Sequence, residues 1–271
     1  MENKELENHI THLTNLLNPV DSIRNPSEAY INNLKSTNQS ELLRLSCLTI
    51  LSEDPLPTSV IETSYILIKQ ISLFLINQFG NFGNEQKQII RMAIKRGLLA
   101  SSTTIQNLAS YCYYVFFKAG RYELESVVLA DLCEPICNPA FQPCCTIGSF
   151  LALKELVSHN LLNEQTPYFP KAAQTILNAF QQVMKNPMIF SQSDFIVFVN
   201  CYSGILNCFY SCFPNPQSRS DFITILYQTF QLNLQIHKSL YNLLFSFVKC
   251  YYAEIIPHLE PIVKITSTSL V

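Results

Sequence analysis

Apolar residues recur every three or four positions along this chain, in segments that end at prolines, glycines or short polar stretches. The first segment ends before Pro19, and its apolar face holds Leu6, Ile10, Leu13 and Leu17. A second segment follows at once, with packed residues predicted at Ala29, Ile31 and Leu34, behind Ser27 and Glu28. A spacing of three to four residues is the pattern of an amphipathic α-helix. We therefore expect two short helices joined by a tight connection.

The pattern then restarts, which predicts a second pair of helices. The first helix of this pair has Leu42, Leu45 and Leu48 on its apolar face and ends at the Asp-Pro-Leu-Pro run over 54–57. A long second helix is expected to pass through Ile61, Tyr65, Ile68 and Ile71. One pair of helices cannot bury its apolar face alone, so consecutive pairs are expected to stack as a solenoid.

A third pair is predicted between residues 84 and 120. Its first helix should run from Asn84 to Leu99, with Gly97 near its end as a stop signal, and its second from Thr103 or Thr104 to Ala119. Gly120 fits a left-handed C-terminal cap. The apolar face of the second helix is expected at Ile105, Leu108, Ala109, Cys112 and Phe116. Later helices are expected at 123–137, 141–158, 168–184, 191–213, 218–230, 236–252 and 255–265.

The first helices of these pairs begin near residues 3, 38, 84, 122, 168, 216 and 254. Their spacing averages about 42 residues, which suits HEAT or armadillo units of about 40–47 residues and not tetratricopeptide repeats of about 34. We therefore predict an all-α fold, an α-solenoid (superhelix) of about six HEAT-type helix pairs plus an unpaired terminal helix. The first two pairs would occupy 1–82. The continuing solenoid would occupy 83–271, and its unpaired last helix suggests truncation.

Composition favours a soluble helical chain but leaves a membrane protein as an alternative. The chain is 48% hydrophobic and only 14% charged, and residues 195–218 contain no charged side chain. A spanning helix needs about 20 mostly apolar residues, whereas this stretch contains Asn200, Ser203 and Asn207 and stops at Pro214. A packed solenoid helix is therefore the favoured interpretation, and no membrane insertion is expected.

The first residues are acidic and amphipathic and lack the basic region of a secretory signal. The ten cysteines are therefore expected to be reduced thiols in the cytosol or nucleus. A net charge of −2 offers no basic footprint for nucleic acid.

No motif for catalysis or metal binding stands out. A zinc site could be formed by four cysteines, Cys133, Cys137, Cys144 and Cys145. However, Cys144 and Cys145 are adjacent and cannot easily point at one ion, and both pairs fall on apolar helical faces. His9 and His12 share a helix face without a third ligand. A Cys–His pair formed across distant repeats stays open, because such sites are set by space and not by sequence. We expect no enzyme, no cofactor and no metal.

The order of landmarks near the amino terminus resembles that of nuclear transport receptors of the importin-β family. The first pair matches through Leu16-Leu17-Asn18-Pro19, Arg24, Glu28-Ala29 and Leu34. In the second pair, residues 62–70 resemble a family helix and keep its lysine as Lys69, with Glu62 and Gln70 in place of an arginine and an asparagine. In the third pair, residues 105–109 resemble an Ile-Arg-Asn-Gln-Leu-Ala pattern without the arginine.

The resemblance implies a carrier that binds the small GTPase Ran in its GTP form through the second helices of the first repeats. Further implied partners are nucleoporins and a cargo or adaptor protein, in the cytoplasm, in the nucleus and at the pores of the nuclear envelope. The implied GTPase-binding residues are Lys69, Gln106, Asn107 and Ser110, as polar positions opposite the core. Lys69 snorkelling from a packed helix, and plain solvated positions at the others, are the alternative interpretations. The alternative function is a HEAT scaffold without Ran regulation.

Two further surfaces have an expected character. Arg91, Lys95 and Arg96 fall at helical spacing in a first helix, where a solvated outer face is the favoured interpretation. Phe245, Phe247 and Val248 lie in a pair that expects a following repeat, so we expect an exposed apolar patch there.

Overall fold

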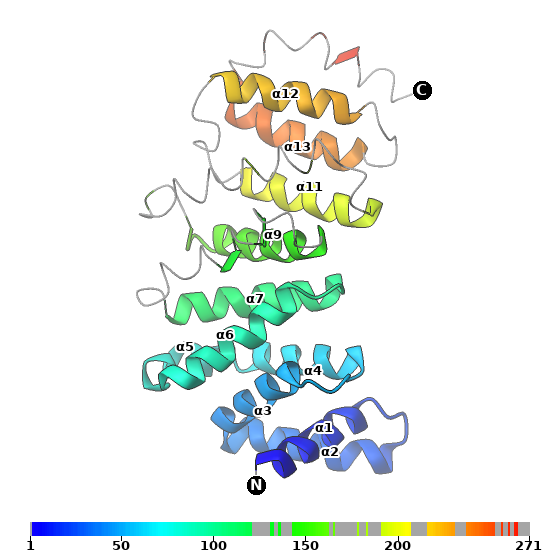
Figure 1. The fold of residues 1–271 in the computed structure, drawn as a ribbon, viewed down its shortest axis with the longest axis vertical. Coiled ribbons are helices and arrows are strands. Elements are labelled where there is room, and N and C mark those ends of the chain that lie inside the picture. The colour runs from blue at the N-terminus through cyan, green and yellow to red at the C-terminus, as the bar shows by residue number, and fades with distance from the viewer. Residues whose placement is uncertain are drawn as a thin grey trace. The chain divides into compact units, whose positions relative to one another are not determined.

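The computed structural model describes residues 2–120, 143–162, 191–206, 216–230 and 237–252, with residues 131, 132, 135, 136, 165, 178, 183, 256, 260, 263 and 264 besides. All regular secondary structure in these residues is helical, and none of them forms a β-strand (Figure 1). Helices pack against helices close to them in the sequence, as a stack of pairs requires. The chain divides into two compact units, Met1–Glu125 and Ser126–Val271, described in turn.

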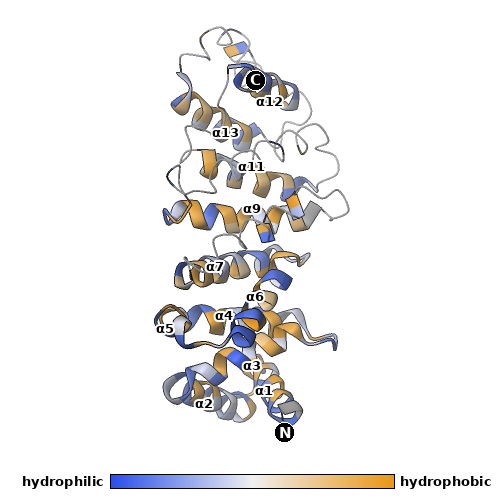
Figure 2. Ribbon diagram, turned by 60° about the vertical axis from the view of Figure 1, so that its left-hand side comes forward, coloured by the Kyte–Doolittle hydropathy of each residue, from blue (hydrophilic) through white to orange (hydrophobic). Residues whose placement is uncertain are grey.

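Unit 1 contains the three predicted pairs, with an extra short helix after the fourth helix. Its elements are α1 (Glu2–Leu16), α2 (Asp21–Thr37), α3 (Gln39–Leu51), α4 (Thr58–Gln70), α5 (Ser72–Gln78), the 3₁₀ turn η1 (Phe79–Asn81), α6 (Asn84–Leu98) and α7 (Thr103–Ala119). The first helices pack side by side, α1 on α3 and α3 on α6, and the second helices α4 and α7 do the same. Within pairs, α1 packs on α2, α3 on α4, and α6 on α7. Hydrophobic and hydrophilic stretches alternate along these helices (Figure 2).

The first pair differs from its prediction in detail. Helix α2 begins at Asp21, directly after the break at Pro19 as predicted, and has Pro26 inside it. Ser27 and Ile31 are its buried residues, and Ala29 is exposed. Leu17 is 51% exposed because it lies beyond the end of α1 at Leu16, outside the face that packs.

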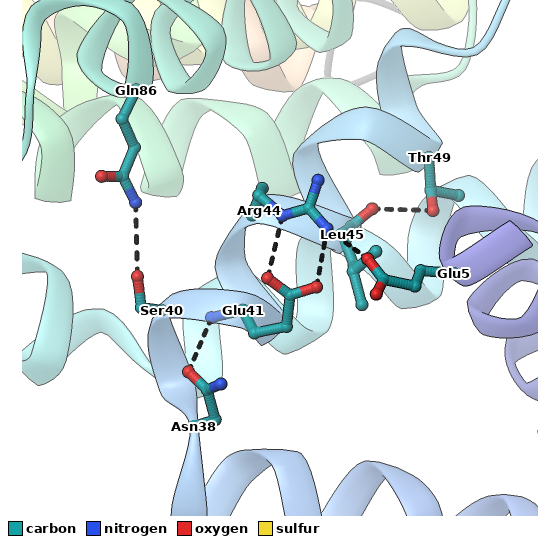
Figure 3. A network of polar contacts seen from close by, with 8 residues as sticks. All are labelled: Glu5, Asn38, Ser40, Glu41, Arg44, Leu45, Thr49 and Gln86. Atoms are coloured by element: carbon teal, nitrogen blue, oxygen red, sulfur yellow. Dashed lines mark hydrogen bonds and ion pairs between the residues drawn. The ribbon is translucent and has the colours of Figure 1, made fainter. Parts of the chain in front are cut away.

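Polar contacts tie the first helices of neighbouring pairs together (Figure 3). Arg44 of α3 donates to both carboxylate oxygens of Glu41, at 2.7 and 2.8 Å, and reaches Glu5 of α1 at 3.2 Å. The bond from Arg44 stabilises the ionised carboxylate and lowers the pKa of Glu41. Asn38 ends α2 and also begins α3, because its Oδ1 accepts the backbone N–H of Glu41 at 3.1 Å.

The predicted long helix through Ile71 is wrong, because the helix is broken there. Helix α4 ends at Gln70, α5 begins at Ser72, and the two are bent by 57°. The bend brings α5 and η1 against α7, where Phe79 is buried with its ring 5.3 Å from that of Phe116. Packing against α7 therefore overrides the continuous helical pattern of the sequence.

Helix termini in the third pair also differ from the predictions. Helix α7 is capped by Ser102 and not by Thr103 or Thr104, since the Ser102 hydroxyl accepts the backbone N–H of Ile105. Gly120 ends α7 at φ −111°, so it does not adopt a left-handed conformation. Gly97 lies inside α6, and a Cβ there would come within 2.2 Å of the Tyr65 hydroxyl oxygen. This glycine permits close packing and is not a stop signal.

Unit 2 contains α9 (Pro143–Ser158), α11 (Gln192–Leu206), α12 (Pro216–Phe230) and α13 (His237–Cys250). These match four predicted helices, with ends that agree within two residues where both ends are described. Helices α9, α11 and α13 are second helices of successive predicted pairs, and they pack side by side, with α12 on α13. Aromatic rings form much of this core, including Phe222 stacked on Phe247 at 4.4 Å.

Three expectations lie outside the described residues, namely most of the helices at 123–137, 168–184 and 255–265. The division of the solenoid between residues 82 and 83 stays a prediction. In the described residues no single helix is long and apolar enough to cross a membrane, while the bent pair α4–α5 together meets the limits of length and composition. Phe245 is 71% exposed, as expected for an apolar patch, whereas Phe247 is fully buried.

Candidate protein-binding surface

Lys69 is the predicted site residue that lies on a well-defined exposed surface. It belongs to the last turn of α4, where its side chain is exposed. The ammonium nitrogen lies 4.7 Å from the centre of the Tyr111 ring of α7. A cation over an aromatic face at this distance is attracted by about 0.5–1 kcal/mol at an exposed site. The contact therefore holds a positive charge where α4 and α7 meet.

A stripe of polar and aromatic residues on α7 continues from this contact. Asn107, Tyr111, Tyr114 and Lys118 follow at a spacing that places them on one side of the helix. The Tyr111 and Tyr114 rings meet edge to face at 5.7 Å, and the Lys118 ammonium donates to the Tyr114 hydroxyl at 3.3 Å. Tyr114 is only 8% exposed and belongs to the core beneath the other residues. We refer to Lys69, Asn107, Tyr111 and Lys118 as the lysine–tyrosine surface.

Of the other predicted site residues, only Asn107 is exposed. Its side-chain amide donates to the Thr103 carbonyl at 2.9 Å, one turn earlier on α7. Gln106 and Ser110 are 1% and 2% exposed, so the expectation that they face solvent is wrong. The physical reason is that α7 packs against α4, α5 and α6 and has little free surface.

The two buried residues have structural partners instead. The Gln106 amide donates to the carbonyl oxygens of Ala100, at 2.7 Å, and Leu98, at 3.4 Å, where α6 ends. Helix ends leave carbonyls without intrahelical partners, so this side chain completes the turn between α6 and α7. The Ser110 hydroxyl donates to the Asn107 carbonyl at 2.8 Å within α7.

Beneath the surface, buried contacts set the position of α4 relative to α6 and α7. The Tyr65 hydroxyl, fully buried, donates to the Ala93 carbonyl of α6 at 2.6 Å. The Cys112 thiol of α7 contacts the Tyr65 carbonyl at 3.8 Å. These contacts join three helices one turn below Lys69, which keeps the lysine in register with Tyr111.

Two of the described buried thiols, those of Cys112 and Cys201, have no sign of activation. Burial raises the pKa of Cys112 to about 12 and that of Cys201 to about 11. A reactive thiol has a lowered pKa, so these two side chains act as small apolar groups. Among the described residues, no group of three potential metal ligands comes together. Cys145 is buried, and the other three residues of the zinc hypothesis lie outside the side chains that the structure describes.

Apolar and basic side chains border the lysine–tyrosine surface. Ile66 of α4 and Leu73 of α5 are 41% and 73% exposed. Next to Lys69 in the sequence, Gln70 accepts a hydrogen bond at its side-chain oxygen from the Lys35 ammonium of α2, at 2.8 Å. The region thus combines positive charge, aromatic rings and exposed aliphatic groups, which is a composition suited to protein contacts. The tyrosines and Lys118 escaped the sequence analysis, although their spacing on α7 was a signal that could have found them.

Comparison with known proteins adds no relative. No family model matches the chain, and a search of curated proteins finds no match. The resemblance to the importin-β family therefore rests on the residues quoted from the sequence.

Proposed function

We propose that this chain is a protein-binding α-solenoid of HEAT type, related to the importin-β receptors, that holds the small GTPase Ran in its GTP form. The lysine–tyrosine surface would be part of the contact. Nucleoporins and a cargo or adaptor protein would be further partners, in transport between cytoplasm and nucleus. The observation that carries the proposal is the exposed Lys69 ammonium over the Tyr111 ring, at the junction of two second helices.

The arrangement of helices supports the solenoid part of this proposal. In unit 1 the first helices form one row and α4 and α7 lie beside each other in a second row. In unit 2, α9, α11 and α13 form a row of second helices. Rows of second helices give an extended surface for a globular partner, which is how stacked repeats bind proteins.

The choice of a GTPase rests on the sequence resemblance and on the chemistry of the surface. GTPase switch segments are ordered by the γ-phosphate and released after hydrolysis, so a partner that contacts them discriminates between nucleotide states. A positive charge held by an aromatic ring contributes to specificity and to the rate of association with a charged surface. Lys69 is also the residue that this chain shares with the family helix in its second pair.

The test is capture of Ran by the full chain, with Ran loaded with a non-hydrolysable GTP analogue or with GDP. We expect the GTP form to bind and the GDP form to be left in solution. Lys69→Glu should weaken binding by about 5- to 10-fold, because it removes the attraction to Tyr111 and reverses a charge at the contact. Surface plasmon resonance should show the change mainly as slower association.

Arg91→Glu is the matched control, because it makes the same change of charge on α6, in the row of first helices. It should leave capture of Ran unchanged. Equal effects of the two substitutions, or no effect of either, would refute the assignment of the surface. Equal capture of the two nucleotide forms would instead favour the second candidate, a HEAT scaffold without Ran regulation.

A further inference from the structure

A cleft of about 410 Å³ lies in unit 1, where the second and third helix pairs meet. One of its sides is the loop over residues 52–56, between α3 and α4, and the other is the end of α6, at Arg96, Gly97 and Ala100. Ligand clefts in proteins usually have volumes of about 300–1,000 Å³, so this one can hold a large side chain of a partner and parts of its neighbours. None of the lining residues belongs to the lysine–tyrosine surface.

Much of the lining of this cleft is apolar. Leu56 of the loop, Ile61 in the first turn of α4 and Ile105 at the start of α7 all contribute to it. Leu56 and Ile61 are half-buried, so part of their apolar surface stays uncovered. Ile50 and Tyr65 also line the cleft and are buried, which anchors it to the core. An apolar side chain of a ligand would therefore lose contact with water here, which favours binding.

Charges of opposite sign accompany these apolar groups. Glu53 and Asp54 belong to the loop, Arg96 belongs to the last turn of α6, and all three are exposed. Among the described residues, neither carboxylate forms an ion pair and Arg96 forms none either, although the three line the same cleft. The cleft thus keeps its opposite charges apart, where each can bind a group of a ligand.

This distribution of charge selects the kind of ligand. A ligand with charge of one sign is attracted at one side of the cleft and repelled at the other. A ligand with a positive and a negative group, separated by an apolar one, is attracted at both sides. Pro55 and Pro57 restrict the backbone of the loop that carries the carboxylates, so less conformational entropy is lost when a ligand binds.

We infer that this cleft binds a segment of a partner protein in which a large apolar side chain stands between a basic and an acidic one. The apolar side chain packs on Leu56 and Ile61, the basic one pairs with Glu53 and Asp54, and the acidic one pairs with Arg96. A guanidinium group binds a carboxylate through two parallel hydrogen bonds, which fixes the orientation of the acidic side chain. The site is independent of the surface proposed for the GTPase, because the two share no residue.

The experiment measures fluorescence anisotropy of labelled synthetic peptides titrated with the full chain. The probe has a phenylalanine between a lysine and a glutamate, each separated from it by a serine, so that in an extended peptide the three side chains face the same way. Both orders of the charges are tested, because the cleft does not fix the direction of the peptide, and at least one order should bind. Alanine in place of the phenylalanine should weaken binding at least about tenfold. Leu56→Ser should weaken binding of the phenylalanine peptide about fivefold and leave that of the alanine peptide nearly unchanged, because the leucine and the phenylalanine are expected to touch.

Exchange of charges tests the two ion pairs. Arg96→Glu should weaken binding of the probe about 3- to 10-fold. A peptide with lysine in place of the glutamate should bind this variant more tightly than it binds the unmodified chain. Asp54→Lys should behave in the opposite way, with a gain for a peptide that has glutamate in place of the lysine.

Lys238→Glu is the control for overall charge, because this lysine is exposed on α13 in unit 2 and its substitution changes the net charge as Arg96→Glu does. It should leave binding of every peptide unchanged. No binding of either order of the probe would overturn the inference. Equal responses of Arg96→Glu and Lys238→Glu would also overturn it, since they indicate general attraction of charge, as would equal losses of both peptides in Leu56→Ser.

Should a variant lose its helical circular dichroism, the peptides measured on the unmodified chain decide the question. Peptides with two lysines or with two glutamates should both bind it more weakly than the probe does, and equal or tighter binding of either would contradict the inference. Capture of Ran should be unchanged in Arg96→Glu. A failure of this site and a failure of the GTPase surface are therefore separate results.

Discussion

Acid should weaken the packing of α1, because His9 is buried there in its neutral form. The side chain of His9 is fully buried, and neither ring nitrogen has a hydrogen-bond partner among the described residues. Burial, together with a smaller effect of the positive charge that His12 can carry, lowers the pKa of His9 to about 4, and Glu41 opposes the change. Protonation of this ring in place would leave a charge without water or a hydrogen bond.

The sign and size of the effect follow from the two pKa values. In the unfolded chain His9 binds a proton near its ordinary pKa of 6.5, whereas in the folded chain it does so only near 4. Between these values the unfolded state holds the extra proton, so stability falls as the pH falls. Each pH unit in this window costs about 1.4 kcal/mol, which gives a total loss of about 3 kcal/mol. Above pH 7 the contribution of His9 is constant.

Hydrogen exchange of backbone amides in α1–α3, followed from pH 7 to pH 4 and corrected for intrinsic exchange rates, measures the local free energy of opening. His9→Leu removes the titrating group. The opening free energy of the unmodified chain should therefore fall by about 3 kcal/mol more than that of the variant over this range. The neighbouring charged groups are present in both proteins, so most of their contribution cancels in the difference.

His159→Leu is the control, since His159 is partly exposed and lies just after α9 in unit 2. It should leave the pH dependence of α1–α3 unaltered. Parallel curves for the unmodified chain and His9→Leu would refute the reasoning, because they would mean that His9 takes up its proton equally well in the folded state.

Two other substitutions test packing. Gly97→Ala should destabilise unit 1 by about 1–3 kcal/mol in urea titrations, because the new Cβ would lie 2.2 Å from the Tyr65 hydroxyl oxygen and 2.6 Å from the Ala109 Cβ; Gly83→Ala, with nothing within 4 Å, is the matched control and should not destabilise it comparably. Phe245→Ser should reduce self-association in sedimentation experiments, since Phe245 is 71% exposed and Tyr252, two turns later, is 64% exposed; a strictly monomeric unmodified chain at high concentration would contradict the expected apolar patch.

The positions of the helices could be predicted well because apolar residues recur every three or four positions on the buried face of each helix. Helix α6 was expected at 84–99 and runs from Asn84 to Leu98, and α7 ends at the predicted Ala119. Leu42 and Leu45 of α3 are buried as the spacing indicated. Apolar residues three or four positions apart must pack on something, so the pattern reports the existence of a helix even without knowledge of its partners.

The details that failed depend on neighbours distant in the sequence. Nothing local marks Ile71 as a break, and the bend there is explained only by the packing of Phe79 on Phe116. Gly97 was read as a stop signal, yet its lack of a Cβ makes room for Tyr65 from another helix. Both cases require knowledge of which helix lies opposite, which periodicity does not contain.

The same limit applied to the candidate site. Polar character predicts exposure only on average, and Gln106 shows why: its amide is buried because the carbonyls of Leu98 and Ala100 need a donor. Lys69 was identified correctly as an exposed residue, but its contact with Tyr111 was not predicted. A cation–π contact joins two helices, and the sequence of neither helix alone indicates it.

Different residues therefore determine the helical repeat of a solenoid and the partner protein that it binds. Buried positions such as Tyr65 and Ile68 set the stacking of the helix pairs. Because a partner protein does not contact them, they do not restrict which protein binds. Exposed positions such as Lys69 and Asn107 decide what binds, and they can change without loss of the fold. A chain can keep the helical pairing of a receptor family while its exposed charges specify other partners. Lys69→Glu is expected to weaken capture of Ran, whereas Arg91→Glu is expected to leave it unchanged, so a comparison of the two variants separates the effect of the proposed contact from a general effect of charge.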